Sequence, residues 1–536
     1  MSLTTTTDEN NVVTSEYKNK QGEVVETRQG GLVTSYVYNE TGSLCTVIPP
    51  KAQDLAVTLP GFKELIFTYK YDSRKRIVEK KIPGAVVAEM VYDSRNRLVM
   101  SRTGNQNANG QWKVYLYDKF DRPVAEYIIG KTDSRLTYES HWETRTVNYK
   151  RQGKTYLVES GSTDLVKVPA ISESNALSYT YYDDYSGWDA AAFNAAAFPT
   201  AAPLYINLPK AQITGSRIKV LDGTKYTATP KWLTTTSYYD HMYRVVQSHS
   251  HLYNGTTTPG TVWISTNYSF DGLPEKVKEI QRFNGTEISI TQRMEYDHAR
   301  RLTREYHKIN NTAEVLVVKN TYDELGRLKK TRQGNNETVT TDYNIRGWID
   351  KSVAGKFAYK LNYYDNGNIK TQQWNRTGNA ASFGSTYNYT YDANNRLLTG
   401  TTAGYGESLT YDANGNITKL VRTGGNEAGT YEYTYKQDNK TNQLEYIKLN
   451  GVTKPAYTYD ANGNITKDGL RNLTIEYNLL NLPKNVKNST NGSLEYIYDA
   501  AGNKLAKKLN GAFVNFYCGS VVYTGSRVCD AFSGYG

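Results

Sequence analysis

One short pattern recurs along most of the chain. A tyrosine, usually followed by aspartate, precedes a polar stretch that ends in Gly or Asn, then Arg, Asn or Lys, then Leu or Ile. The nine residues YDANGNITK occur letter for letter at 411–419 and again at 459–467. Successive copies lie about 20–27 residues apart, which is the spacing of a repeat architecture. The length between the anchors varies, so we predict that the anchor is the fixed part of each repeat.

The anchors predicted to fix the repeat fall into three sets. The Tyr-Asp pairs are Tyr71 and Asp72, Tyr92 and Asp93, Tyr117 and Asp118, Tyr296 and Asp297, Tyr322 and Asp323, Tyr391 and Asp392, Tyr411 and Asp412, Tyr459 and Asp460, and Tyr498 and Asp499. The turn glycines are Gly326, Gly415, Gly463 and Gly502, and the apolar residues are Leu328, Leu397, Ile417 and Ile465. Looser copies begin at Tyr38, Tyr239, Tyr343, Tyr364, Tyr435 and Tyr477.

Each copy reads as a β-hairpin. Tyrosines at 387, 389 and 391 alternate with other residues before the anchor, and a period of two places them on one face of a strand. The aspartate can accept a hydrogen bond from the backbone two residues on, and Gly or Asn tolerates a positive φ. The Leu or Ile six residues after the tyrosine then begins the returning strand, where it can pack beside the tyrosines.

The number of repeats constrains the fold further. A lone hairpin cannot bury one of its faces, so the hairpins must pair edge to edge into a long antiparallel sheet. Strand twist accumulates, so that sheet must curl or coil on itself. The 47 tyrosines and 42 glycines suit strands and turns, and 536 residues exceed what one compact core usually holds. We therefore predict an all-β protein.

These anchors, YDxxGRL and YDxxGNI, resemble the YD repeats of the Rhs family, which includes the shell subunits of insecticidal toxin complexes and the teneurins. The final stretch, FYCGSVVYTGSRVCDAFSGYG, is similar to the close of the core in Rhs proteins of Bacteroidetes, ahead of a variable C-terminal region. The resemblance covers about residues 15–175 and 236–525. It implies a strip of hairpins coiled into a large, hollow, cocoon-like β-spiral.

In this family the shell typically encloses a C-terminal toxin or effector, and in other members it serves adhesion. The resemblance thus implies a non-catalytic shell that encapsulates or presents its own C-terminal effector domain or a partner polypeptide beyond this chain. The alternative is a cell-surface module that binds carbohydrate or protein through exposed tyrosine rows. Family shells often end in a self-cleavage region marked by Asp-Pro, and this chain has no Asp-Pro dipeptide.

The remaining sequence features exclude several function classes. No P-loop, nucleotide-binding glycine pattern, G-x-S-x-G or H-E-x-x-H occurs, so we expect no catalytic residues and no cofactor. The net charge of +11 is dispersed, which argues against a nucleic-acid partner. No secretory signal or apolar span is evident. We expect a monomer that is secreted or held at the cell surface, and a sequence cut from a longer protein.

Two sequence patterns resemble parts of metal sites. His249 and His251 would share one strand face, but no third ligand is signalled nearby, so ordinary strand histidines are favoured.

Asp412 and Asp460 each begin a D-x-N-x-N pattern like that of a calcium loop. The acidic residue expected at the twelfth position is absent, because Thr423 and Arg471 stand there. Turn capping explains the same residues, and we predict no metal.

The anchors lapse in one segment, which divides the chain into residues 1–182, an insertion at 183–235, and residues 236–536. The Ala-rich stretch WDAAAFNAAAF predicts a short helix that begins near Gly187 or Asp189 and ends at Pro199. Its aromatic residues Trp188, Phe193 and Phe198 either contact a cargo as a plug or pack over the edge of the sheet. The second interpretation is favoured.

The three cysteines, Cys45, Cys518 and Cys529, are too few for a disulfide framework. Either Cys518 and Cys529 form one bridge or all three are free thiols.

Overall fold

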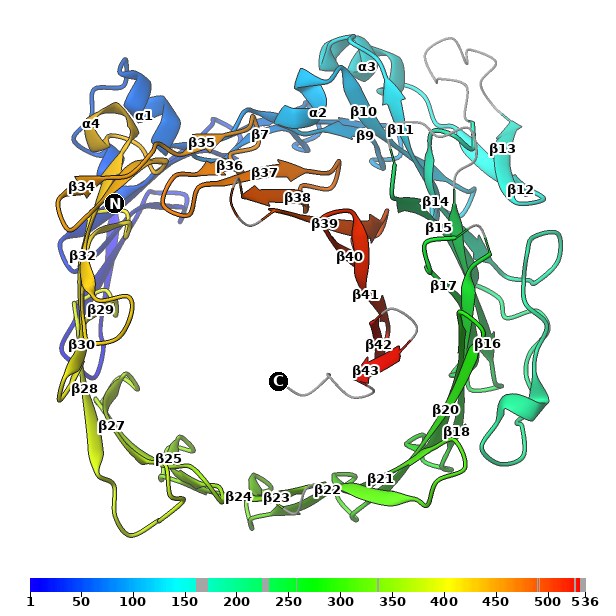
Figure 1. Ribbon diagram of the computed structural model, residues 1–536. Coiled ribbons are helices and arrows are strands. Elements are labelled where there is room, and N and C mark those ends of the chain that lie inside the picture. The colour runs from blue at the N-terminus through cyan, green and yellow to red at the C-terminus, as the bar shows by residue number, and fades with distance from the viewer. Residues whose placement is uncertain are drawn as a thin grey trace. The chain divides into compact units, whose positions relative to one another are not determined.

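The computed structural model describes residues 1–160, 172–223, 231–256, 258–334, 337–488, 490 and 492–524, and the backbone of 527–530. It divides into two compact units, each built from two separate stretches of chain. The first unit comprises residues 1–89 and 320–473, and the second comprises 90–319 and 474–536. The chain therefore passes through each unit twice. Figure 1 shows that arrows dominate both stretches of each unit and that helices are few and short.

The strands of the first unit pair antiparallel with their sequence neighbours, mostly across short turns. In the first pass they are β1 (Ser2–Thr7), β2 (Val13–Lys18), β3 (Val24–Gln29), β4 (Leu32–Tyr38), β5 (Leu44–Ile48), β6 (Phe67–Tyr71) and β7 (Ile77–Lys81), and β8 (Ala88–Tyr92) crosses into the second unit.

In the second pass through this unit they are β23 (Leu328–Gln333), β24 (Thr338–Tyr343), β25 (Ile349–Val353), β26 (Ala358–Tyr363), β27 (Ile369–Asn375), β28 (Ser385–Tyr391), β29 (Leu397–Thr402), β30 (Tyr405–Tyr411), β31 (Ile417–Thr423), β32 (Gly429–Tyr435), β33 (Leu444–Leu449), β34 (Val452–Thr453), β35 (Thr458–Tyr459) and β36 (Ile465–Asp468).

The second unit follows the same plan. Its strands are β9 (Leu98–Arg102), β10 (Gln111–Tyr117), β11 (Pro123–Gly130), β14 (Ala176–Tyr182), β15 (Ile213–Leu221), β16 (Trp232–Tyr239), β17 (Val245–Leu252), β18 (Gly260–Tyr268), β19 (Pro274–Phe283), β20 (Thr286–Tyr296), β21 (Leu302–Ile309), β38 (Pro483–Asn488), β39 (Gly492–Asp499), β40 (Lys504–Leu509), β41 (Ala512–Cys518), β42 (Val521–Thr524) and β43 (Arg527–Asp530).

β22 (Val315–Tyr322) and β37 (Leu473–Tyr477) contain the other two unit boundaries. β12 (Asn148–Gln152) and β13 (Thr155–Ser160) form a separate two-stranded sheet in the second unit.

The two passes of the second unit meet directly. β15 pairs with β39, Val220 opposite Asp499 and Leu221 opposite Tyr498. One apolar core combines Val220 and Phe283 from the first pass with Ile497 and Phe516 from the second. A larger core, centred on fully buried Trp112, Tyr127, Tyr179 and Tyr181, lies entirely in the first pass. β15 lies within residues 183–235, so the segment without anchors also contributes a strand to the sheet.

The repeat turns have the predicted local form. In the turn after Tyr411, the Gly415 N–H donates to the Asp412 carbonyl (3.1 Å), and the Asp412 N–H donates to the Asn416 carbonyl (2.9 Å). Gly415 has a φ of 87°, which glycine adopts without strain. The ladder shifts register here, so Tyr411 stands opposite Ile417. This is a turn followed by a bulge, and it carries the tyrosine and the aliphatic residue on one face.

The all-β fold is confirmed, and the helices are short. They are η1 (Pro50–Ala52), α1 (Pro60–Leu65), α2 (Gly104–Ala108), α3 (Arg135–Trp142), the 3-10 turn η2 (Ala195–Ala197) and α4 (Lys436–Asn439). Of these, the sequence interpretation expected only a helix in the Ala-rich stretch. α3 was missed, although Ser134 caps it and Tyr138 and Trp142, four residues apart, bury one face.

The helix predicted to begin near Gly187 or Asp189 and to end at Pro199 reduces to η2. Before that turn, backbone groups of Ala191 and Asn194 form hydrogen bonds with side chains of the sheet. The Ala191 N–H donates to Thr236 Oγ1 (3.1 Å), and the Asn194 N–H and carbonyl bond the amide of Gln247 (2.8 and 2.9 Å). Tertiary hydrogen bonds thus override the helix propensity of alanine.

No helix among the described residues is long and apolar enough to cross a membrane.

Candidate functional site: the joint between repeats

The aspartate of each anchor caps its own turn. Asp412 Oδ1 accepts hydrogen bonds from the N–H groups of Asn414 (3.0 Å) and Asn416 (2.9 Å). The same pair of bonds, from the residues two and four positions on, is made by Asp72, Asp93, Asp118, Asp240, Asp297, Asp323, Asp392, Asp460 and Asp499. One oxygen therefore satisfies two turn donors in each of these copies.

The second carboxylate oxygen holds the residue four positions later. Where that residue is arginine, its Nε donates to Oδ2, as in Arg396 to Asp392 (2.6 Å). In the YDANGN copies the amide of Asn416 or Asn464 takes this place, at 2.8 and 2.9 Å from Asp412 and Asp460.

The arginine also reaches the next repeat. Arg396 lies over the ring of Tyr411 with its guanidinium carbon 4.8 Å from the ring centre, and its Nη1 donates to the Asp412 carbonyl (3.0 Å). Arg97 lies over Tyr117 and Arg327 over Tyr343 in the same way, at 5.0 and 4.6 Å. A guanidinium on a tyrosine face contributes about 0.5–2 kcal/mol.

The anchor tyrosine of each repeat also forms a hydrogen bond with the preceding repeat. Tyr411 Oη donates to the carbonyl of Leu397 (2.7 Å), the first residue of the returning strand in the preceding hairpin. The same bond links Tyr38 to Val24, Tyr71 to Leu44, Tyr117 to Leu98, Tyr182 to Pro123, Tyr239 to Ile213, Tyr268 to Val245, Tyr296 to Pro274, Tyr343 to Leu328, Tyr363 to Ile349, Tyr435 to Ile417 and Tyr459 to Leu444. Neighbouring repeats therefore hold each other in both directions, and we call this arrangement the joint.

One loose copy is placed differently from the sequence prediction. Tyr363, not Tyr364, makes the anchor bond, and it stands opposite Ile369. Tyr364 occupies the aspartate position, since its N–H donates to the Asn368 carbonyl (2.8 Å). The copy is therefore of full length, with tyrosine where the others have aspartate.

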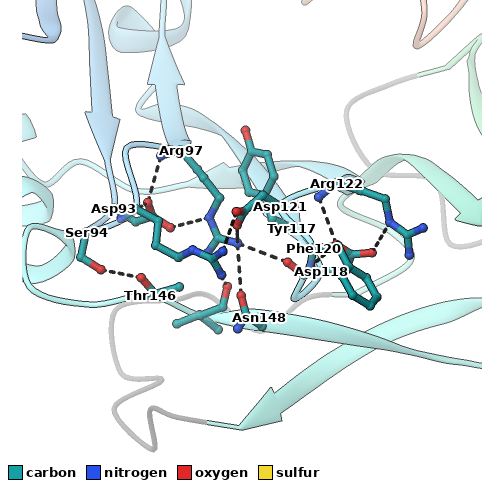
Figure 2. A network of polar contacts seen from close by, with 12 residues as sticks. Asp93, Ser94, Arg97, Tyr117, Asp118, Phe120, Asp121, Arg122, Thr146 and Asn148 are labelled. Carbon is teal, nitrogen blue, oxygen red and sulfur yellow. Dashed lines mark hydrogen bonds and ion pairs between the residues drawn. The ribbon is translucent and has the colours of Figure 1, made fainter. Parts of the chain in front are cut away.

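The joint at Asp93 is the most deeply buried of those with an arginine. The Asp93 side chain is 0% exposed and that of Arg97 5% exposed, and Arg97 Nε lies 2.7 Å from Asp93 Oδ2. Figure 2 shows the Arg97 side chain reaching from Asp93 toward Asp121 and Asn148. Its Nη1 lies 3.0 Å from Asp121 Oδ1 and 3.1 Å from Asn148 Oδ1, and Nη2 donates to the Val147 carbonyl. The joint thereby anchors the segment before the β12–β13 hairpin.

In the first unit a lysine from the first pass replaces a missing arginine. Lys51, in η1, lies with Nζ 2.6 Å from Asp412 Oδ2 and 4.9 Å from the centre of the Tyr435 ring. In other repeats the arginine makes these two contacts. In this copy Asn416 stands at the position of that arginine. Lys51 Nζ also donates to the Thr441 carbonyl (2.7 Å). The sequence analysis did not identify Lys51, because the only local sign of its role is Asn416 at the position where other repeats have arginine.

Other bonds join the same two passes of the first unit. The Gln443 side chain donates to the Gly84 carbonyl, and the Val86 N–H donates to the Ala461 carbonyl, both at 2.8 Å. The second YDANGNITK copy is therefore also contacted from the first pass.

The three aromatic residues proposed as plug or cargo contacts pack on the sheet. Trp188 is 7% and Phe198 5% exposed. Trp188 stacks on Tyr181 with ring centres 4.5 Å apart, and a Cβ at Gly215 would lie only 2.0 Å from the indole. Phe193 stacks on Tyr205 at 4.5 Å. Glycine at 215 thus makes room for the insertion.

The predicted histidine pair does share a strand, β17, where the ring centres of His249 and His251 are 5.8 Å apart. The His249 ring packs on Trp263 at 4.3 Å, and burial lowers its pKa to about 4. Within the described ranges, no group of three or more His, Cys, Asp or Glu side chains is arranged to hold a metal ion.

Cys518 is a buried free thiol whose pKa burial raises to about 12, and Cys45 is half-buried and also free. The side chain of Cys529 lies outside the described residues, so the predicted bridge between Cys518 and Cys529 lies outside them as well.

We expect the joints to open at alkaline pH. Burial raises the pKa of Tyr459 to about 12 and raises that of Tyr411 above its usual 10. The folded state therefore binds these protons more tightly than the unfolded chain, so their stabilisation is complete below pH 10 and falls as the pH rises toward 12. Tyrosinate absorbance and circular dichroism, followed together, should show ionisation of these tyrosines coinciding with loss of strand signal.

The urea-unfolded chain is the control, and its tyrosines should all ionise near pH 10. Complete ionisation near pH 10 in the native protein, with the strand signal intact, would contradict this expectation.

The fold and the joints define a repeat protein built from β-hairpins. Residues 354–514 match the family model of the teneurin YD-shell. The chain also has the fold of toxin-complex shells. It matches the structure titled TcdB2-TccC3-Cdc42 with a TM-score of 0.69 and 13% identity over 97% of its length. These findings confirm the resemblance to the Rhs/YD-repeat family.

Two further solved structures show the same likeness. A Photorhabdus luminescens Tc holotoxin pore with the TccC3-D651A mutation matches with a TM-score of 0.67, and TcdB2-TccC3 without its hypervariable C-terminal region with 0.66, both at 13% identity over 97% of this chain. This chain spans about a quarter of the length of the chains it matches. No curated protein matches it.

Proposed function

We propose that this chain is the wall of a non-catalytic shell that encapsulates a polypeptide, either its own C-terminal effector domain or a partner chain. The observation that carries the proposal is the joint, which repeats with the same bonds in hairpin after hairpin. A joint that links each repeat to its neighbours can extend a wall to any length. The likeness to toxin-complex shells supports the same function.

The chemistry of the joint also favours structure over catalysis. The aspartate oxygens of a joint such as Asp392 are occupied by turn N–H groups and by Arg396, and the arginine is held in turn by a tyrosine ring. A carboxylate with this many donors is held ionised and has no proton to exchange at neutral pH. The pKa of Asp392 is accordingly lowered by its bonds to Arg396 and to the turn backbone, against the opposing effect of burial.

We place the protein outside the cell or at its surface, as a monomer.

Limited proteolysis of the full-length gene product tests the encapsulation. We expect any segment that follows residue 536 to resist protease while the shell is folded, and to be cleaved once urea opens the shell. The same segment expressed alone should be cleaved without urea. Equal cleavage rates with and without the folded shell, or the absence of any downstream segment or co-purifying polypeptide, would overturn the proposal.

A further inference from the structure

A row of exposed apolar side chains follows one edge of the sheet in the second unit. β14, β16, β18 and β20 alternate with β15, β17 and β19 in antiparallel pairs, so these four strands run in the same direction and end at the same edge. Successive turns at this edge lie about 10 Å apart, which is twice the distance between neighbouring strands. Met242 and Tyr243 occupy the turn after β16, and Phe270 occupies the turn after β18. All three side chains are exposed.

The insertion between β14 and β15 adds to the same row. The Ile206 N–H donates to the carbonyl of Tyr239, the last residue of β16 (2.8 Å), so this part of the insertion lies beside the β16–β17 turn. Leu204 and Leu208, two residues to either side of Ile206, are 79% and 63% exposed. We call Leu204, Leu208, Met242, Tyr243 and Phe270 the edge row.

The repeat turn does not need apolar residues at these positions. Met242 stands three residues after its anchor tyrosine, where the turn after Tyr411 has Asn414, and Phe270 stands two residues after its own, where that turn has Ala413. The N–H groups of Met242 and Asn414 both donate to the aspartate that caps their turn, at 2.9 and 3.0 Å. The turn therefore closes with either kind of residue, and the apolar side chains have another use.

Another turn of the same unit shows an apolar turn residue that is covered. Leu479, in the turn after β37, packs against a core that contains Ile128 and Leu177. Met242 is 74% exposed and Phe270 fully exposed, so no part of the described chain covers them in this way. Single exposed apolar residues are common on protein surfaces, but five at one edge mark a surface that another molecule covers.

The free charge beside the edge row is positive. Lys210 follows Leu208 by two residues, is exposed, and makes no ion pair within the ranges that the structure describes. Arg300 lies next to Phe270, because its Nη2 donates to the Asp271 carbonyl (2.8 Å). The turn carboxylates at this edge are already paired, Asp183 with Arg122, Asp240 with Arg244, Asp271 with Arg300 and Asp297 with Arg301. An anionic partner would meet the unpaired ammonium without competing for it.

From these observations we infer that the edge row is a membrane-docking surface for a bilayer that contains anionic lipids. Side chains at the tips of separate turns enter a fluid bilayer one by one, whereas a protein partner needs a surface of matching shape. The apolar side chains would enter the boundary between headgroups and acyl chains, and Lys210 would meet the anionic headgroups. Such docking is independent of encapsulation, since it uses turns at one edge of one unit.

Flotation of the intact chain with phosphatidylcholine vesicles, with and without phosphatidylglycerol, tests the inference. We expect binding to the vesicles that contain phosphatidylglycerol and weaker binding to the others. Met242→Asn and Phe270→Ala should each lower the partition coefficient about tenfold, because each removes a large apolar side chain from the bilayer. Both variants should keep the melting temperature of the parent, since they place in the turn the residues that the repeat after Tyr411 has there.

Two further variants separate the edge row from general surface effects. Val315→Asn replaces an exposed apolar residue that begins β22 at the opposite edge, and it should leave vesicle binding unchanged. Lys210→Glu should weaken binding only to the vesicles that contain phosphatidylglycerol.

Four results would overturn the inference. They are no binding to either kind of vesicle, equal binding to both kinds, unchanged binding in Met242→Asn and Phe270→Ala, and self-association in sedimentation velocity that these two variants abolish. The last result would show that a second copy of the chain covers the edge row.

Discussion

Asp93→Ala is expected to destabilise the second unit by about 3–5 kcal/mol, the usual cost of removing one partner from a buried ion pair. The substitution leaves the guanidinium of Arg97, 5% exposed, without its carboxylate, and leaves the N–H groups of Arg95 and Arg97 without their acceptor. Urea unfolding monitored by hydrogen exchange, which resolves the two units, measures the loss. Amides of β9 to β11 should lose protection first, because Arg97 also holds Asp121 and Asn148.

Asp240→Ala is the matched control in the same unit. Asp240 caps its turn with the same bonds and pairs with Arg244, but the Arg244 side chain is 31% exposed, so water can solvate the guanidinium once the carboxylate is gone. The loss of unfolding free energy in Asp240→Ala should be less than half the loss in Asp93→Ala. Equal losses would show that burial of the pair does not set the strength of a joint, and the explanation given for Arg97 would fail.

Lys51→Ala is expected to destabilise the first unit by about 3 kcal/mol. The side chains of Lys51 and Asp412 are 10% and 13% exposed, so the carboxylate loses its cation in a largely buried setting. The Thr441 carbonyl and the Tyr435 ring lose their cationic partner as well. The midpoint of urea unfolding for amides of β30 to β33 measures the effect. Lys356→Ala, at an exposed lysine of the same unit, should change nothing.

The double variant Lys51→Ala with Asn416→Arg tests whether Lys51 replaces the arginine of other joints. Asn416→Arg alone should destabilise, because two cations would then compete for one carboxylate and one ring. In the Lys51→Ala background it should recover about half of the loss, because the arginine can reach Asp412 and Tyr435 as Arg396 reaches Asp392 and Tyr411. Additive losses in the double variant would contradict this replacement.

Much of the joint could be predicted from the sequence, because its bonds are local. Asp412 caps residues two and four positions away, and the aliphatic residue opposite the tyrosine is six positions on. Alternating tyrosines and a turn glycine fix strand, bend and register within a span of about ten residues. The helix predicted in the Ala-rich stretch does not form, because contacts distant in sequence decide its backbone there. Side chains of β16 and β17 form hydrogen bonds with its backbone groups.

The sequence by itself determined the hairpin, its bulged turn and the direction in which each repeat faces the next, because those features depend on residues a few positions apart. Only the tertiary structure decided which joints are buried and where the charge of a missing arginine comes from. Lys51 and Asp412 are 361 positions apart, and no local pattern connects them. The pocket lined by Asp118, Arg151 and Asp183 likewise exists only where a repeat turn, a separate hairpin and the end of β14 meet in space. Contacts of that kind depend on how strands distant in sequence pack, which a repeat motif does not encode.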